Sequence, residues 1–168
     1  RHDTYKVPAD IAPRAPRAYG VTVGVNSTDS SRFRSLSFAV KDAQVLATSL
    51  AQIPGYDVVP VSLLSDTRSK TALNQATKAN LRTVLEVLAG KPADRSRLQG
   101  IANVEKLAKA TPDDLVIVAF SGHGHTERDG RFYLVPADSG REDRITAAAL
   151  TKFISSEELS IWLRGVDA

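Results

Sequence analysis

The stretch LVIVAFSGHG at residues 115–124 decides the fold of this chain. Its apolar run, residues 115–120, is bounded by polar residues and glycine, and this pattern predicts a buried strand of a parallel sheet. Ligands of open α/β sheets bind just beyond the carboxyl ends of such strands. His123 lies there between Gly122 and Gly124, where it is placed for proton transfer. A turn histidine with incidental glycines would show the same short pattern.

The rest of the chain alternates between strand and helix patterns, which is typical of a parallel sheet with helices on both faces. Pro60 removes a ladder donor from the second strand and favours an edge position for it. We therefore expect an α/β sandwich with a mostly parallel sheet. The sheet should be incomplete, because the last helix should lead to another strand. The predicted elements are strands at 21–25, 58–64, 115–120 and 132–135, helices at 39–53, 81–88 and 101–108, and a helix that opens with a capping box at Ser155–Glu158.

The composition is that of one globular domain, with 42% hydrophobic and 24% charged residues. Residues 1–18 carry scattered prolines without apolar periodicity, so we predict a linker or surface arm there and one domain over 19–168. The net charge of +3 comes without a block of basic residues and gives no argument for nucleic acid as a partner. No apolar stretch reaches the ~18 residues of a membrane span.

The chain contains neither cysteine nor methionine. The first absence excludes disulfides and cysteine-ligated metals, and it is compatible with the cytoplasmic location that we expect. Since the sequence begins at Arg1 without a methionine, we expect a fragment, a processed chain or a domain of something longer.

Three residues near the His-Gly motif have alternative interpretations. Asp42 lies in the first turn of a predicted helix, where the helix dipole favours a carboxylate by roughly 0.3–1 kcal/mol, and it could equally line a pocket. His125 could join His123 as a metal ligand, but no further ligand follows closely, so we expect no metal and assign His125 to a loop near the cleft. The side chains of Ser121 and His123 project from the same extended segment, so Ser121 is a poor candidate for a nucleophile that His123 activates.

Several stretches, in the same order, carry a resemblance to a known family. FSGHG at 120–124 is similar to the histidine motif of the caspase and metacaspase cysteine proteases (clan CD, peptidase family C14). LSFAVKDA at 36–43 is similar to the opening of their first helix, YLVPAD at 133–138 to the segment after the histidine, and 154–163 to the helix before the nucleophile strand. The resemblance spans about 21 to 166 and implies a caspase-like αβα sandwich.

In that family a Cys–His dyad hydrolyses peptide bonds, and backbone N–H groups stabilise the oxyanion. Carried over, His123 is the base and the N–H of Gly124 an oxyanion donor. The cysteine follows the histidine by roughly 50 residues in caspases, and the sequence given ends at Ala168, before that strand. The resemblance therefore implies that this is the histidine-bearing, p20-like part, and that its partners are a polypeptide substrate and a cysteine-bearing, p10-like segment.

The resemblance also implies a substrate preference. Leu36 stands where caspases that cut after aspartate carry an arginine. Asp42 and Ser121 instead match the metacaspase-like arrangement, whose anionic pocket prefers Arg or Lys at the scissile position. We expect no cofactor, and calcium dependence is left open because no calcium motif is present.

Two other functions remain as alternatives. A catalytically inactive caspase homologue, acting as a scaffold or regulatory module, would have another residue at the cysteine position. A metal-dependent hydrolase using His123 and His125 would bind metal and resist thiol alkylation.

Overall fold

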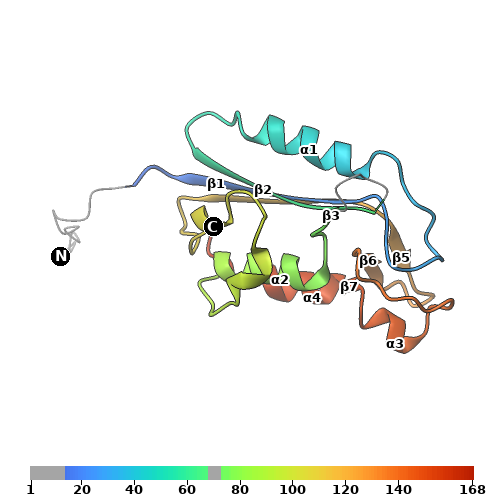
Figure 1. Ribbon diagram of the computed structural model, residues 1–168. Helices are drawn as coiled ribbons and strands as arrows, with labels where there is room; N and C mark the ends of the chain where they lie inside the picture. The colour runs from blue at the N-terminus through green and yellow to red at the C-terminus, as the bar shows by residue number, and fades with distance from the viewer. Residues whose placement is uncertain (1–13, 68–72) are drawn as a thin grey trace, which may run out of the picture.

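The computed structural model describes residues 14–67 and 73–168, and it has a central sheet between two helix layers. Helix α1 covers one face of the sheet, whereas α2 and α4 cover the other (Figure 1). The elements of the main body are β1 (Arg17–Val25), α1 (Ala39–Leu50), β2 (Asp57–Asp66), β3 (Leu73–Asn74), α2 (Lys78–Leu88), β4 (Leu115–Ser121) and α4 (Ser156–Leu163). A second, small sheet consists of β5 (Gly124–Thr126), β6 (Phe132–Leu134) and β7 (Ile154–Ser155), with α3 (Ala147–Leu150) beside it.

The central sheet has the order β3-β2-β1-β4, and its three long strands run parallel. The antiparallel β3 pairs only with the last two residues of β2, Ser65 and Asp66. An α/β fold with a three-stranded parallel sheet and helices on both faces is thereby confirmed, and it is compatible with an αβα sandwich. The carboxyl ends of the three strands meet at one edge, which is where sheets of this kind bind ligands.

The central strand β1 is buried along almost its whole length and lies directly under α1. A Cβ atom on Gly24 would come within 2.8 Å of the carbonyl oxygen of Ala39, so only glycine lets α1 start this close to the strand. The face of α1 toward the sheet is correspondingly made of small residues, Ala39, Ala43 and Ala47. This close packing fixes the first turn of α1 beside the carboxyl end of β1.

The strand β4 differs from its prediction in one respect. It is parallel to β1 as expected, but its side chains are half-buried from Leu115 to Ser121 where full burial was predicted. The reason is topological, because β4 is the last strand of the sheet and its second edge faces no other strand of the described residues. The strand β2, predicted at an edge because of Pro60, is the second strand of the sheet. Since β3 pairs only with Ser65 and Asp66, Pro60 itself still lies at an open edge, where its carbonyl accepts a hydrogen bond from Asn103 Nδ2 at 2.8 Å.

The segment between α2 and β4 was predicted less well. A 3₁₀ turn, Val104–Lys106, replaces the helix predicted at 101–108, and a second 3₁₀ turn, Arg95–Leu98, precedes it. Leu98 is fully buried, although it lies in a polar stretch. As a single apolar residue among polar ones, it shows no period that would reveal its burial.

The two ends of the described chain are partly as predicted. The capping box of α4 is confirmed, since Ser155 and Glu158 exchange side chain-to-backbone hydrogen bonds of 3.1 Å. Leu163, near the end of that helix, is 37% exposed. The predicted arm lies mostly outside the described residues, and its last two residues, Arg17 and Ala18, already belong to β1. None of the helices in the described ranges is long and apolar enough to cross a membrane.

Candidate active site

His123 follows β4 directly, and its imidazole is held by the loop between β1 and α1. The Nε2 atom lies 2.7 Å from the carbonyl oxygen of Arg34. Because a carbonyl oxygen can only accept, Nε2 carries the proton of the neutral ring and Nδ1 is left as the proton acceptor. The ring of Phe33 lies beside the imidazole with a centroid distance of 5.3 Å. His123 is thus a half-exposed base with a defined tautomer.

The loop that carries Arg34 is itself fixed by hydrogen bonds to the body of the protein. The N–H of Leu36 donates to the carbonyl of Asn26 at 2.7 Å, and the N–H of Asp29 donates to the carbonyl of Ala137 at 2.8 Å. Since both halves of the loop are anchored, the Arg34 carbonyl is a preorganised acceptor.

The two glycines of the motif serve packing and not an unusual backbone conformation. Neither has a positive φ angle. A Cβ atom on Gly122 would lie 2.8 Å from the ring of Phe120, and a Cβ atom on Gly124 would lie 2.8 Å from the ring of Phe132. Glycine is therefore needed because two aromatic rings pack against the backbone on either side of His123.

The N–H of Gly124 is available as a donor next to His123. Gly124 pairs with Leu134 in the antiparallel β5–β6 hairpin, directly beside a hydrogen bond of 3.0 Å from the Val135 N–H to the His123 carbonyl. Hydrogen-bonded and non-hydrogen-bonded pairs alternate in such a ladder, so the N–H of Gly124 points away from β6. Gly124 is also exposed, so this N–H is not taken up by the hairpin.

Asp42 and Ser121, which were predicted to share a substrate pocket, lie on one small hollow between α1 and β4. The hollow has a volume of about 90 Å³, and its other walls are apolar side chains: Val23, Ala43, Leu46, Ala119 and Phe120. In the described chain neither the Asp42 carboxylate nor the Ser121 hydroxyl has a hydrogen-bond partner. Apolar walls with one carboxylate suit the aliphatic stem and the cationic head of a lysine or arginine side chain.

His125 does not join His123. Its Nε2 atom is 2.6 Å from Glu127 Oε1, and its ring packs on Tyr133 and Phe153. In residues 14–67 and 73–168 no group of three or more His, Asp or Glu side chains could hold a metal ion. The two histidines therefore have separate partners, each at its own Nε2.

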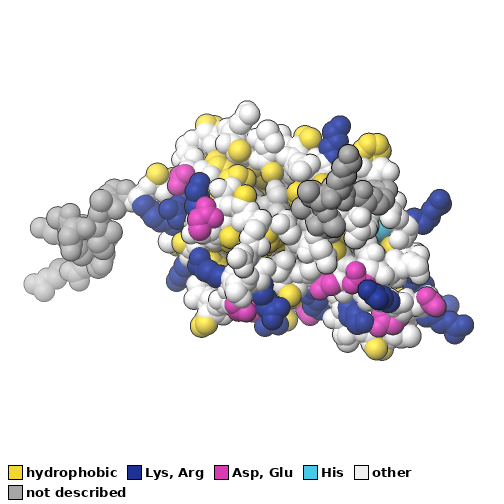
Figure 2. Space-filling model, in the orientation of Figure 1, with side chains coloured by type: hydrophobic (Ala, Val, Ile, Leu, Met, Phe, Trp, Pro, Cys, Tyr) yellow, Lys and Arg dark blue, Asp and Glu magenta, His cyan; other side chains and the backbone are white. Residues whose placement is uncertain are grey.

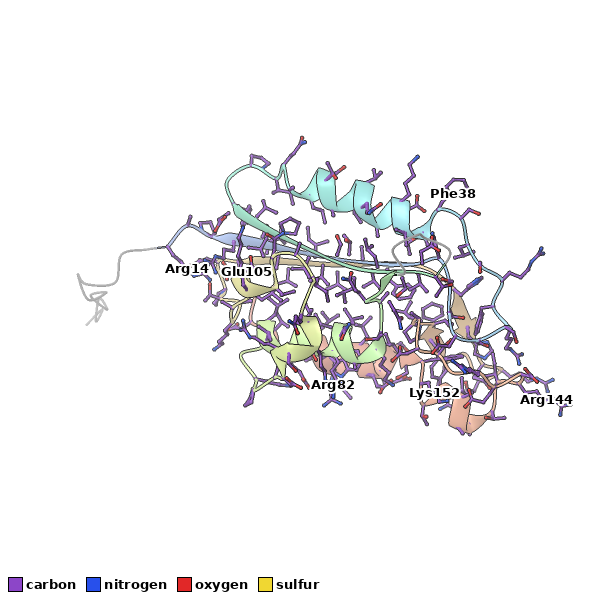
Figure 3. All side chains as sticks on the ribbon, viewed as in Figure 1. Arg14, Phe38, Arg82, Glu105, Arg144 and Lys152 are labelled. Atoms are coloured by element: carbon purple, nitrogen blue, oxygen red, sulfur yellow. The ribbon has the colours of Figure 1, made fainter. Side chains whose placement is uncertain are left out.

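Apolar side chains from both helix layers surround the unpaired edge of β4. Leu46 of α1 lines the hollow next to Ala119 on one face of the sheet, and Leu163 of α4 lines a second hollow next to Leu115 on the other. Each of these two leucines is 37% exposed. Figure 2 shows that hydrophobic side chains also reach the surface over α1, and Phe38 at its start projects away from the sheet (Figure 3). Apolar side chains thus remain partly exposed on both sides of the edge of β4 that pairs with no other strand of the described residues.

The residues that orient His123 could not be found from the sequence. The Arg34 acceptor is a backbone carbonyl, which every residue has, and Phe33 is one aromatic residue in a loop. Asn26 offered a weak signal, because it is a polar residue directly after a strand at the edge where sites form.

The chain matches no protein-family model, and no curated protein and no solved structure is significantly similar to it.

Proposed function

We propose that this chain is the histidine-bearing part of a caspase-like cysteine endopeptidase that cleaves after Arg or Lys. The observation that carries the proposal is the orientation of His123, whose Nε2 donates to the Arg34 carbonyl and whose Nδ1 is free. Gly124, Asp42 and Ser121 support it, because Gly124 offers a backbone donor next to His123 and the other two residues line a hollow that contains a carboxylate.

The reaction would use these groups in sequence. Nδ1 of His123 takes the thiol proton, and the thiolate attacks the scissile carbonyl carbon. The oxyanion so formed accepts a hydrogen bond from the N–H of Gly124. His123 then gives its proton to the leaving amine as the C–N bond breaks. Water attacks the acyl-enzyme with His123 again as base, the C–S bond breaks, and His123 returns the proton to the thiolate. No cofactor takes part in this scheme.

The nucleophile comes from outside this sequence, which has no cysteine. A strand added parallel to β4 would bring its carboxyl end next to the carboxyl end of β4, and hence next to His123. The unpaired edge of β4 and the leucines on either side of it, Leu46 and Leu163, support such an addition. We infer a cytoplasmic setting, because a catalytic thiol stays reduced there.

The lack of a cysteine also favours the second candidate, a catalytically inactive homologue that acts as a scaffold. The two candidates share the strand addition at β4 and differ in the residue at the end of the added strand. Only the first requires a thiol there.

The test is to assay the chain, assembled with the segment that completes its sheet, on a library of fluorogenic peptides. We expect cleavage after Arg and Lys that a thiol-alkylating agent abolishes. No cleavage, together with a completing strand that lacks cysteine, would identify the inactive homologue. Cleavage that withstands alkylation but stops with a metal chelator would support the metal-dependent alternative.

A further inference from the structure

Asn26 is a buried polar residue that uses every hydrogen-bonding group it has. It is the first residue after β1 and is 5% exposed. Its backbone N–H donates to the Ser65 carbonyl at 2.9 Å and its carbonyl accepts from the Leu36 N–H at 2.7 Å. Its side-chain oxygen accepts from the Val40 N–H at 3.1 Å, and its amide nitrogen donates to Asp66 Oδ2 at 2.7 Å. Such complete use marks a residue that holds separate segments together.

One of these bonds caps α1 from another part of the chain. The N-cap position is occupied by Phe38, which provides no side-chain acceptor. The Oδ1 atom of Asn26 takes over this task at the N–H of Val40. An acceptor at this place satisfies one of the free N–H groups of the first helical turn. Asp42 belongs to that turn, so Asn26 helps to set where its carboxylate lies.

A second bond closes the loop that orients His123. The carbonyl of Asn26 binds the N–H of Leu36, two residues after Arg34, whose own carbonyl holds the imidazole. The position of this carbonyl therefore depends on the closure at Asn26.

The bond to Asp66 fixes the side-chain amide of Asn26 in the orientation that the capping of α1 needs. A carboxylate accepts only from the amide nitrogen, so Oδ1 must face Val40. Asp66 ends β2, and Asn26 thus joins the ends of two neighbouring strands.

We propose that Asn26 is a positioning residue that sets His123 and Asp42 in a common frame. The inference rests on the proposed function, because it assigns both side chains to one site. The inference can also be tested without measuring catalysis, because the tautomer of His123 is observable by itself.

The test uses Asn26→Asp, Asp66→Asn and the double variant, with Asn103→Asp as the matched control. Asn26→Asp keeps an acceptor for Val40 but brings a second carboxylate against Asp66, so the bond between them is lost. The double variant restores an amide-to-carboxylate bond with the two groups exchanged. Asn103→Asp removes the donor to the Pro60 carbonyl, which lies away from the site.

Long-range ¹H–¹⁵N correlation spectra should show His123 as the Nε2–H tautomer in the unchanged chain. In Asn26→Asp we expect a mixture of tautomers, and in the double variant a return to Nε2–H, while Asn103→Asp keeps the original tautomer. In the assembled peptidase, kcat should fall by up to about 10²-fold in Asn26→Asp, the loss that a misplacement of about 1 Å can cause, and recover in the double variant.

An unchanged tautomer in Asn26→Asp, or a change that the double variant fails to reverse, would overturn the proposal. Loss of the Nε2–H tautomer in Asn103→Asp would also overturn the proposal, because a substitution away from the site would then change the tautomer of His123 as well. If the assembled protein cleaves no peptide at all, the proposed function fails, and the tautomer and its rescue still decide whether Asn26 positions His123.

Discussion

The imidazole Nε2 of His123 lies 2.7 Å from the carbonyl oxygen of Arg34, and this hydrogen bond joins the residue after β4 to the loop after β1. A side-chain carboxylate in the place of that carbonyl would attract the imidazolium strongly. A neutral carbonyl orients the ring and keeps Nδ1 directed away from the loop. The orientation of the imidazole therefore depends on how firmly the loop is held.

Phe33 is expected to keep the ring of His123 in this position. Its ring lies 5.3 Å from the imidazole and 5.8 Å from the ring of Phe153, between centroids. Phe33→Ala should lower kcat with little change in KM, and the free energy of unfolding should fall by roughly 0.5–1.5 kcal/mol for each of these two ring pairs. Phe33→Tyr should restore both. Phe38→Ala is the control, because Phe38 is 66% exposed; an equal fall in kcat there would contradict the role of Phe33.

Asp42 is expected to select for a basic side chain. Asp42→Asn should lower kcat/KM for Arg and Lys substrates about 10- to 100-fold, since a hydrogen bond to a charged group contributes about 1.5–3 kcal/mol. Substrates with a neutral residue at that position should be cleaved as before. The control is Asp113→Asn, on an exposed carboxylate before β4. An equal loss on all substrates would argue against the pocket.

Gly124 is expected to tolerate no side chain while Phe132 is present. A Cβ atom there would lie 2.8 Å from the Phe132 ring, so Gly124→Ala should lower the free energy of unfolding by about 1–3 kcal/mol. Denaturant titration measures this loss. Adding Phe132→Ala should remove most of the clash between the two side chains, and if the double variant is as strained as Gly124→Ala alone, the ring is not the cause.

Asp114 is expected to make the stability of the protein fall in acid. Burial alone would raise its pKa, but hydrogen bonds from the Arg14 guanidinium, the Arg17 N–H and Thr111 outweigh burial and lower the pKa to about 2. Arg14, labelled at the start of the described chain in Figure 3, forms an ion pair with this carboxylate. Because the folded pKa lies below the unfolded value of 3.8, the stabilisation is complete above about pH 4 and is lost toward pH 2.

The size of this effect is about 2 kcal/mol, from the difference between the two pKa values. Unfolding titrations between pH 6 and 2 should show the loss in the unchanged chain and a flatter pH dependence in Asp114→Asn. The exposed Asp113→Asn serves as the control. The same slope in the unchanged chain and in Asp114→Asn would show that Asp114 is not the group responsible.

The elements with strong local patterns were predictable from the sequence, and the interactions made by backbone groups were not. α2 and α4 followed from their apolar period and, for α4, from the Ser155–Glu158 capping box. Asp42 and Ser121 line one hollow because α1 packs on the end of β4. The Arg34 carbonyl has no sequence signature.

The most direct test of the central claim compares His123→Ala with His125→Ala in the chain assembled with its cysteine-bearing segment. Cleavage of an Arg or Lys peptide is measured, and the melting temperature shows whether each variant is folded. The account predicts that His123→Ala abolishes cleavage with the fold intact, and that His125→Ala retains it. Cleavage that survives in a folded His123→Ala protein would contradict the assignment of His123 as the base.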